Sequence, residues 1–157
     1  MDAEPVPDEE IRYHVEQAGL QISTPVDWSS GAGFHGALAV FTAPHPPDTP
    51  FTSTLTVITR PRDPADVPGN EVADQARALL ELDDALLLES AWTSVGERPA
   101  AWAVVAYTHG EFELTLEQWI VAGEQTLVVL SATVLTIDYG YDAGLYEDIV
   151  GSVSFDG

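Results

Sequence analysis

Four long strand-like segments follow one another between residues 86 and 134, and short turns alone separate them. They are rich in β-branched, aromatic and other apolar residues and span 86–95, 101–108, 111–121 and 126–134. Such runs, bounded by turn residues, are typical of strands. Strands joined by short turns pair antiparallel, whereas parallel neighbours need a long crossover connection. The segment therefore predicts an antiparallel sheet.

The residues before this segment add shorter strands and one helix. The runs 11–17 and 20–24, separated by Ala18-Gly19, form a predicted hairpin. A flexible connector at 28–36 and a proline-rich loop at 44–50 flank the strand 37–42, and another strand spans 53–59. A helical period then appears at 70–84, where Val72, Ala76 and Leu79 share one face and Asn70 is a suitable N-cap.

A second short helix over 141–150 and a last strand over 152–155 complete the predicted elements. Strands that follow each other directly, with helices at two separate points, give an α+β fold. We expect an antiparallel sheet of about six to eight strands covered by two or more helices, an α/β/α sandwich. Residues 1–10 are expected to form a flexible acidic leader, and 11–157 a single domain.

The turn at His109-Gly110 predicts a register for the central hairpin. As a two-residue loop it would pair Thr108 with Glu111 and Tyr107 with Phe112. One face of the hairpin is then apolar and belongs to the core. The other face mixes apolar and acidic residues, so we expect it to be half covered; it carries Trp102, Val104, Ala106, Glu113, Thr115, Glu117 and Trp119.

The charge of the chain excludes two classes of partner. It has no lysine, and five arginines face 26 acidic residues, which gives a formal net charge of -21. Nucleic acids and anionic membranes attract lysine and arginine, so both would be repelled by this surface. The acidity is either that of a solvated surface from a high-salt or high-GC organism, or a field that attracts basic partners.

Composition also bounds location and cofactors. There is no cysteine, which removes disulfides, thiolate chemistry and cysteine-ligated zinc. The first residues lack the basic start and apolar stretch of a signal peptide, and no apolar run reaches the length of a membrane span. We therefore expect a cytoplasmic protein without a membrane anchor, and we predict no cofactor and no metal.

Motifs that would indicate catalysis are weak or missing. Residues 31–36 match G-x-G-x-x-G, but a strand follows the glycines where the dinucleotide-binding mechanism needs a helix. The histidines, at positions 14, 35, 45 and 109, lack metal-binding spacings, and no G-x-S-x-G elbow is present. Asp83 and Asp84 are adjacent on the predicted helix and diverge, so we interpret them as surface residues.

The mixed face of the hairpin supplies the candidate binding residues, which are Trp102, Glu113, Glu117 and Trp119. Tryptophans on strands are more often core than binding residues. Trp119 has polar neighbours on its face and is the preferred partner contact, because aromatic anchors dominate interfaces. Trp102 lies among Val104 and Ala106 and is expected to lean towards the core.

Three local signatures, in order, resemble the PsbP-like superfamily, which includes the PsbP, DcrB, LpqN and Ran-binding Mog proteins. They are Pro25-Val26-Asp27-Trp28, Gly96-Glu97-Arg98-Pro99-Ala100 and the ending Tyr146-Glu147-Asp148-Ile149-Val150-Gly151-Ser152-Val153-Ser154-Phe155. The resemblance covers residues 20–155. It implies an antiparallel sheet sandwiched between helices and a role in binding proteins without catalysis. The chain departs from the LpqN lipoproteins in having no lipobox cysteine, and from PsbP in having no lysine.

We therefore expect a non-enzymatic adaptor or chaperone, similar to chaperones of secreted effectors. Its partner would be another protein, either basic or with an apolar segment, and a homodimer stays open. The alternative is a small-molecule or lipid carrier with a pocket between sheet and helix. An enzyme using carboxylates gathered by the fold, such as Glu113 and Glu117, is a third hypothesis.

Overall fold

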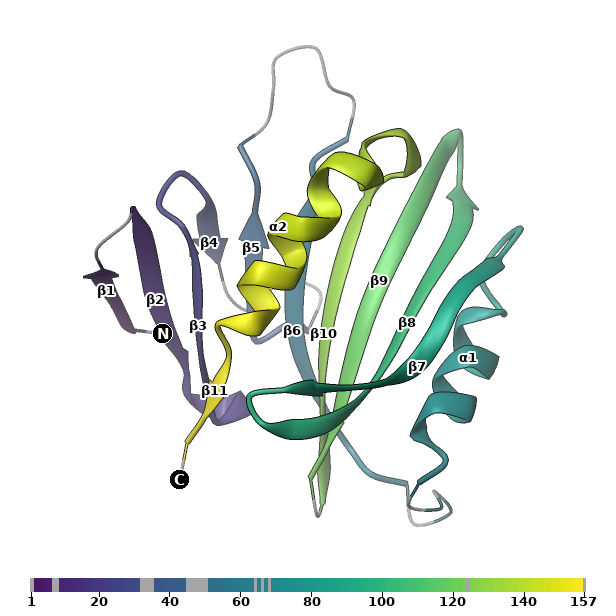
Figure 1. Ribbon diagram of the computed structural model, residues 1–157, viewed down its shortest axis with the longest axis horizontal. Coiled ribbons are helices and arrows are strands. Elements are labelled where there is room, and N and C mark those ends of the chain that lie inside the picture. The colour runs from purple at the N-terminus through teal and green to yellow at the C-terminus, as the bar shows by residue number, and fades with distance from the viewer. Residues whose placement is uncertain are drawn as a thin grey trace.

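The computed structural model describes residues 2–6, 9–31, 36–44, 51–63, 65, 67, 69–123 and 125–156, the first of these ranges as backbone alone. Within them the chain forms eleven strands, two α-helices and two short 3-10 helices (Figure 1). Residues 32–35 of the glycine motif lie outside the described residues, as do His35, His45 and residues 45–50 of the proline-rich loop.

Seven of these strands form the large sheet, in the order β4-β5-β6-β10-β9-β8-β7. Every neighbouring pair is antiparallel. The strands are β4 (Ser29–Gly31), β5 (Ala39–Thr42), β6 (Thr54–Pro61), β7 (Leu86–Val95), β8 (Arg98–His109), β9 (Phe112–Ala122) and β10 (Thr126–Leu135). The antiparallel sheet that the strand pattern predicts is confirmed, with β4 as an addition inside the expected connector.

The small sheet has the order β1-β2-β3-β11 and unites both ends of the chain. Its strands are β1 (Asp2–Val6), β2 (Glu10–Val15), β3 (Leu20–Pro25) and β11 (Ser154–Phe155), and η1 (Glu16–Ala18) joins β2 to β3. The β2–β3 hairpin agrees with the predicted one. Residues 2–6, for which we expected a flexible leader, pair antiparallel with β2.

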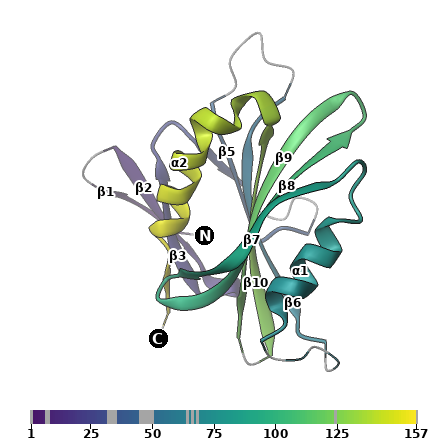
Figure 2. The same ribbon diagram turned by 45° about the vertical axis from the view of Figure 1, so that its right-hand side comes forward.

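The two helices cover opposite faces of the large sheet (Figure 2). α1 (Glu71–Leu79) packs on β7, β8 and β9, whereas α2 (Tyr139–Gly151), which follows η2 (Thr136–Asp138), packs on β10 and β3. α1 is shorter than the predicted 70–84, because the chain turns after Leu80 and Asp84 adopts a φ of 52°. Asn70 occupies the N-cap position, but its side chain makes no capping hydrogen bond.

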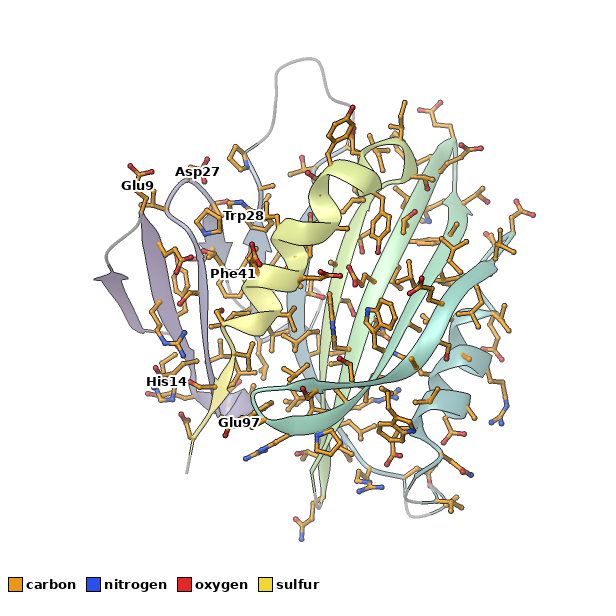
Figure 3. The ribbon with its side chains drawn as sticks, viewed as in Figure 1. Glu9, His14, Asp27, Trp28, Phe41 and Glu97 are labelled. Atoms are coloured by element: carbon orange, nitrogen blue, oxygen red, sulfur yellow. The ribbon has the colours of Figure 1, made fainter. Side chains whose placement is uncertain are left out.

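The main core lies between the small sheet, α2 and the large sheet. Aromatic side chains connect these layers: Tyr13 stands 5.1 Å from Phe41, and Trp28 meets Tyr146 of α2 edge-on at 5.9 Å between ring centroids. Figure 3 shows Trp28 and Phe41 beside α2. Two smaller clusters, around Ile120 and Val105, fill the space under α1. Apolar residues thus occupy both faces of the large sheet.

The β8–β9 hairpin has a register two residues away from the predicted one. His109 pairs with Phe112 and Tyr107 with Leu114, so the two-residue loop is Gly110-Glu111 and not His109-Gly110. Gly110 adopts a φ of 61° at the first loop position, which glycine accepts without strain. A shift of two keeps every side chain on its predicted face, because faces alternate with a period of two.

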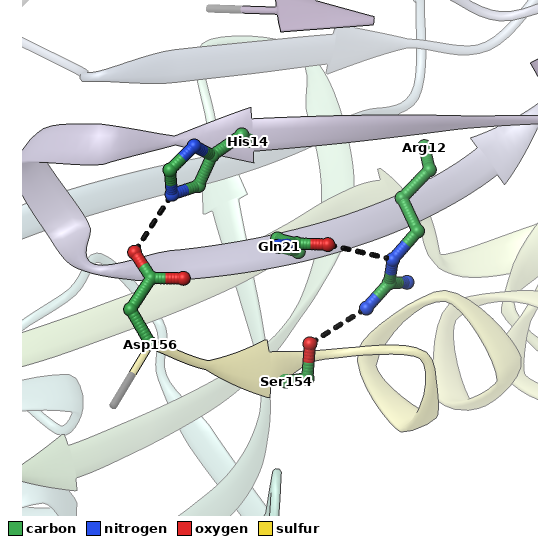
Figure 4. A network of polar contacts seen from close by, with 5 residues as sticks. All are labelled: Arg12, His14, Gln21, Ser154 and Asp156. Atoms are coloured by element: carbon green, nitrogen blue, oxygen red, sulfur yellow. Dashed lines mark hydrogen bonds and ion pairs between the residues drawn. The ribbon is translucent and has the colours of Figure 1, made fainter. Parts of the chain in front are cut away.

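Arg12 holds the last strand onto the small sheet (Figure 4). Its guanidinium donates hydrogen bonds to Gln21, Ser23, the Ser152 carbonyl and Ser154, at 2.7 to 3.2 Å. His14 lies 2.7 Å from the Asp156 carboxylate on the same surface. Because hydrogen bonds to a charged group are stronger than neutral ones, this network fixes β11 and the end of α2.

Candidate functional site

A solvent-open cleft of about 260 Å³ lies where α2 passes over the β7 side of the large sheet. Its walls come from β7, β8, β9 and α2, and the lining residues are Thr93, Ser94, Trp102, Glu117, Trp119, Glu147, Val150 and Gly151. Three of the four sequence-predicted binding residues are therefore in one place. We refer to this site as the Glu117 cleft.

Glu117 is the unusual residue of the cleft, because a carboxyl group is rarely buried without a charged partner. Its side chain belongs to the central strand β9 and is 1% exposed. The Trp102 indole Nε1–H donates a hydrogen bond of 2.8 Å to Glu117 Oε2. The other oxygen, Oε1, is buried and has no hydrogen-bond partner among the described residues. One carboxyl oxygen of Glu117 thus has a hydrogen-bond partner, and the other makes no hydrogen bond of ordinary length.

Burial raises the pKa of Glu117 from 4.5 to about 7. The hydrogen bond from Trp102 opposes this rise, whereas the negative charges of Glu147 and Glu89 add to it. The Tyr139 hydroxyl lies near enough to favour the carboxylate, and burial together with that charge raises its own pKa to about 12. The carboxyl of Glu117 is therefore divided between its neutral and charged forms near neutral pH.

The structure differs from our expectation about the two tryptophans. Trp119 is 5% exposed and belongs to the main core, whereas Trp102 is partly buried and packs against that core from the edge. The mixed face is also covered more fully than expected, since Val104 and Glu117 are buried. Trp119 lies on β9, next to the strand β10 on which α2 packs, whereas Trp102 lies on β8, one strand closer to the sheet edge. Glu113 is exposed and does not line the cleft.

Sequence reasoning missed the half of the cleft that comes from other elements. Thr93 and Ser94 belong to β7, and Glu147 and Val150 to α2. Glu147 and Val150 belong to the closing signature of the sequence, but that signature does not mark them as site residues, because they meet Glu117 only through the packing of α2 on the sheet. The alternation of Glu113 and Glu117 with apolar residues was the available signal, and it predicts a polar face without showing which acid is buried.

The part of the chain that the structure describes contains no cluster of metal-ligand side chains. No three histidine or acidic side chains are placed there to share a metal ion. His109 is exposed, as expected for a surface residue, but it is the last residue of β8 and lies outside the two-residue loop. No described helix is long and apolar enough to cross a membrane.

β7 borders the Glu117 cleft and forms an edge of the large sheet. It pairs with β8 on one side, through a register that shifts between Leu87 and Glu89. Three large apolar side chains on it are exposed: Leu86 at 62%, Leu88 at 48% and Trp92 at 51%. A ten-residue edge with such side chains is uncommon, because proteins usually shorten or cover exposed edges.

Comparison with known proteins identifies the architecture. No protein-family model matches the sequence, and no curated protein matches it. Solved structures that share the fold include LpqN, CyanoP and PA94. LpqN of Mycobacterium tuberculosis, involved in cell envelope biogenesis, is 16% identical with a TM-score of 0.76, covering 94% of this chain and 91% of LpqN. CyanoP, the cyanobacterial PsbP of Synechocystis sp. PCC 6803, is 12% identical with a TM-score of 0.68, covering 97% of both chains.

The third structure is PA94 of Pseudomonas aeruginosa, a protein of unknown function described as a putative regulator. It is 13% identical with a TM-score of 0.64, covering 92% of this chain and 95% of PA94. Identities this low demonstrate a common fold and carry no function across. The PsbP-like resemblance of the sequence is confirmed at the level of the fold.

Proposed function

Because the chain has the PsbP-like fold, we propose that it is a non-enzymatic binding protein, an adaptor or chaperone, that adds a basic polypeptide segment to the free edge of β7. The exposure of β7 carries this proposal. Its outer edge faces no described strand, and Leu86, Leu88 and Trp92 are all about half exposed or more.

Strand addition uses what a free edge supplies. Unpaired backbone N–H and C=O groups give the affinity, and side-chain contacts on alternate positions give the selectivity. The same edge would otherwise favour aggregation, and the register shift at Leu87/Glu89 is one local irregularity that limits it. The exposed apolar side chains of β7, which are Leu86, Leu88 and Trp92, are those that a partner segment would cover.

The net negative charge of the protein favours partner segments that are basic. With a net charge of -21, the protein repels acidic segments and accelerates encounters with basic ones. Glu89 lies on β7 itself, and Glu147 lies across the adjoining cleft. A segment that alternates apolar with lysine or arginine residues therefore fits this edge best.

The carrier alternative keeps one candidate cavity, an open hollow of about 600 Å³ beside α2 that Trp28, Tyr141 and Leu145 line. The space under α1 and the Glu117 cleft are smaller. Under α1, the space between helix and sheet is about 40 Å³, room for a few water molecules. Drug-sized ligands occupy pockets of about 300–1,000 Å³. The Glu117 cleft is also below that range, so it suits one chemical group better than a whole carried molecule.

Selection from a library of displayed random peptides tests the proposal. We expect enrichment of extended peptides with alternating apolar residues and at least one lysine or arginine. Leu88→Asp and Trp92→Ala should weaken the selected peptides at least about tenfold, because interface anchors carry most of the binding energy. Ile137→Ala is the matched control, since Ile137 is 84% exposed on η2, away from β7.

Two results would overturn the proposal. One is a selection that yields no binder, or peptides without basic residues. The other is binding that survives both β7 substitutions as well as it survives Ile137→Ala. Circular dichroism of each variant shows that its fold is retained.

A further inference from the structure

We propose that the Glu117 cleft is a binding site for a primary ammonium group, which donates a hydrogen bond to the unpartnered oxygen of Glu117. The ligand class is a small alkylamine or a lysine side chain. This inference stands whether or not a polypeptide docks on β7, because it rests on the cleft alone.

The carboxyl of Glu117 lacks what an ammonium group supplies. Oε1 is buried with no hydrogen-bond partner, and leaving a buried acceptor unpaired costs about 1–3 kcal/mol. The carboxylate form also lies near Glu89 and Glu147 without a cation beside it. A buried charge is tolerated when an opposite charge pairs with it. One ammonium group meets both needs.

The single free carboxyl oxygen of Glu117 favours an ammonium group over a guanidinium group as the ligand. An arginine fork binds a carboxylate through two parallel hydrogen bonds, one to each oxygen. Here the Trp102 indole already occupies Oε2 at 2.8 Å, while Oε1 has no partner at hydrogen-bond length and the Tyr139 hydroxyl stabilises the carboxylate from nearby. A single acceptor suits the compact ammonium, which behaves as a point charge with three donors. Quaternary ammonium groups have no N–H and cannot make this bond.

The walls of the cleft also favour a cation. Trp102 and Trp119 both line it, and tryptophan is the aromatic side chain that attracts cations most strongly. Glu147 stands on the opposite wall and supplies a second carboxylate. A volume of about 260 Å³ lies below that of drug-sized ligand pockets, so it fits a side chain or a small amine.

The protein has no cation of its own for this place. The chain lacks lysine, and none of its five arginines, all of which the structure describes, lines the cleft. Four of them interact elsewhere through their guanidinium groups; these are Arg12, Arg62, Arg77 and Arg98. Arg60 borders the small cavity beside α1. The ammonium group must come from outside the chain.

Protons compete with the ligand for the same oxygen. The groups acting on Glu117 are Glu89 of β7, Tyr139 and Glu147 of α2, and the uncharged indole N–H of Trp102 on β8. Since burial above all, together with these groups, raises the pKa of Glu117 to about 7, acid removes the carboxylate that the ammonium group needs. Apparent affinity should therefore fall about 25-fold between about pH 7.5 and about pH 5.5.

Titration with n-butylammonium chloride at constant ionic strength tests the site, followed by NMR of the Trp102 indole N–H. We expect a saturable shift in the wild-type protein that weakens at least tenfold in Glu117→Gln. Glu113→Gln is the matched control, because it removes the same charge from the same strand face at an exposed position. Tetramethylammonium should shift the signal at least tenfold less than n-butylammonium.

Equal responses of Glu117→Gln and Glu113→Gln would overturn the proposal, because they would show general attraction to an acidic surface. An absent shift in the wild-type protein would overturn it as well. Should Glu117→Gln fail to fold, Thr93→Arg at the exposed cleft wall should fill the site and abolish the response; an unchanged response there would refute the site.

N-acetyl-lysine methylamide distinguishes the two sources of the ammonium group. If it binds as well as n-butylammonium, the site accepts side chains of polypeptides. If n-butylammonium alone binds, the ligand is a free amine. Both results support an ammonium site. After the free-amine result, the peptide selection alone would test the β7 proposal.

Discussion

Replacing Glu117 with glutamine should change how stability depends on pH. The substitution keeps the size of the side chain and an acceptor for the Trp102 indole, and it removes the titrating group. In the wild-type protein the pKa of Glu117 is about 7 when folded, above the 4.5 of an unperturbed glutamate. The folded state therefore binds more protons between these values. The stability contributed by the neutral carboxyl is complete below about pH 4.5 and is lost as pH rises to about 7.

The size of the effect follows from the shift in pKa. Each unit is worth about 1.4 kcal/mol, which sets a ceiling of about 3 kcal/mol for Glu117. Solvent reaches the neighbouring cleft and screens part of the interaction, so we expect about 2 kcal/mol. This cost is the energy of ionising a carboxyl beside Glu89 and Glu147 in a buried position.

Urea unfolding between about pH 5 and about pH 8, followed by tryptophan fluorescence, measures the difference. The unfolding free energy of Glu117→Gln minus that of the wild-type protein should rise by about 2 kcal/mol across this range. All other ionisable groups are common to both proteins, so their contribution cancels. Glu113→Gln serves as the control and should show a flat difference. A difference for Glu117→Gln that varies by less than about 0.5 kcal/mol would refute the assignment of Glu117 as the buried titrating group.

Three other outcomes are expected. The melting temperature should rise with NaCl from about 0.05 to about 1 M, because salt screens the repulsion among -21 net charges; a flat or falling curve would contradict this. Trp119→Ala should cost about 3–5 kcal/mol in urea unfolding, since the side chain is 5% exposed; a loss below about 1 kcal/mol would show that it is not core. Arg12→Ala should destabilise the protein by about 2 kcal/mol or more and speed hydrogen exchange at Phe155, whereas unchanged exchange would mean that β11 is held by pairing alone.

The order of the elements could be predicted from the sequence because strand and helix periods are local properties. The central hairpin shows the limit of that approach. Gly110 occupies either position of a two-residue loop with similar ease, so the register was off by two residues while the faces were right. The end of α1 at Leu79 also escaped prediction, since the apolar pattern continues through Leu80 and Leu82 where the chain already turns.

The site was less predictable, because it depends on where α2 lies. Trp102 and Trp119 pair on the same sheet face, but Trp119 belongs to the main core and Trp102 packs against that core as a partly buried residue. Glu113 and Glu117 also share a face and a strand, but one is exposed and the other is 1% exposed. A sequence pattern with period two shows which strand residues share a sheet face. The sequence has no comparable local signal for where a helix packs on that face.

The small sheet ties the two ends of the chain and so bears on the order of folding. Arg12 donates to the Ser152 carbonyl across 140 sequence positions, and Ser154 pairs with Gln21 of β3. Contacts this distant require closure of a long loop before they contribute energy, which slows folding towards the millisecond-to-second range of all-β proteins. During synthesis β2 and β3 emerge first and have to wait, with Arg12 unpaired, until the final residues leave the ribosome. The last step of folding should therefore be the seating of β11, and a protein stalled short of residue 152 would keep an open sheet edge for chaperones and proteases to recognise.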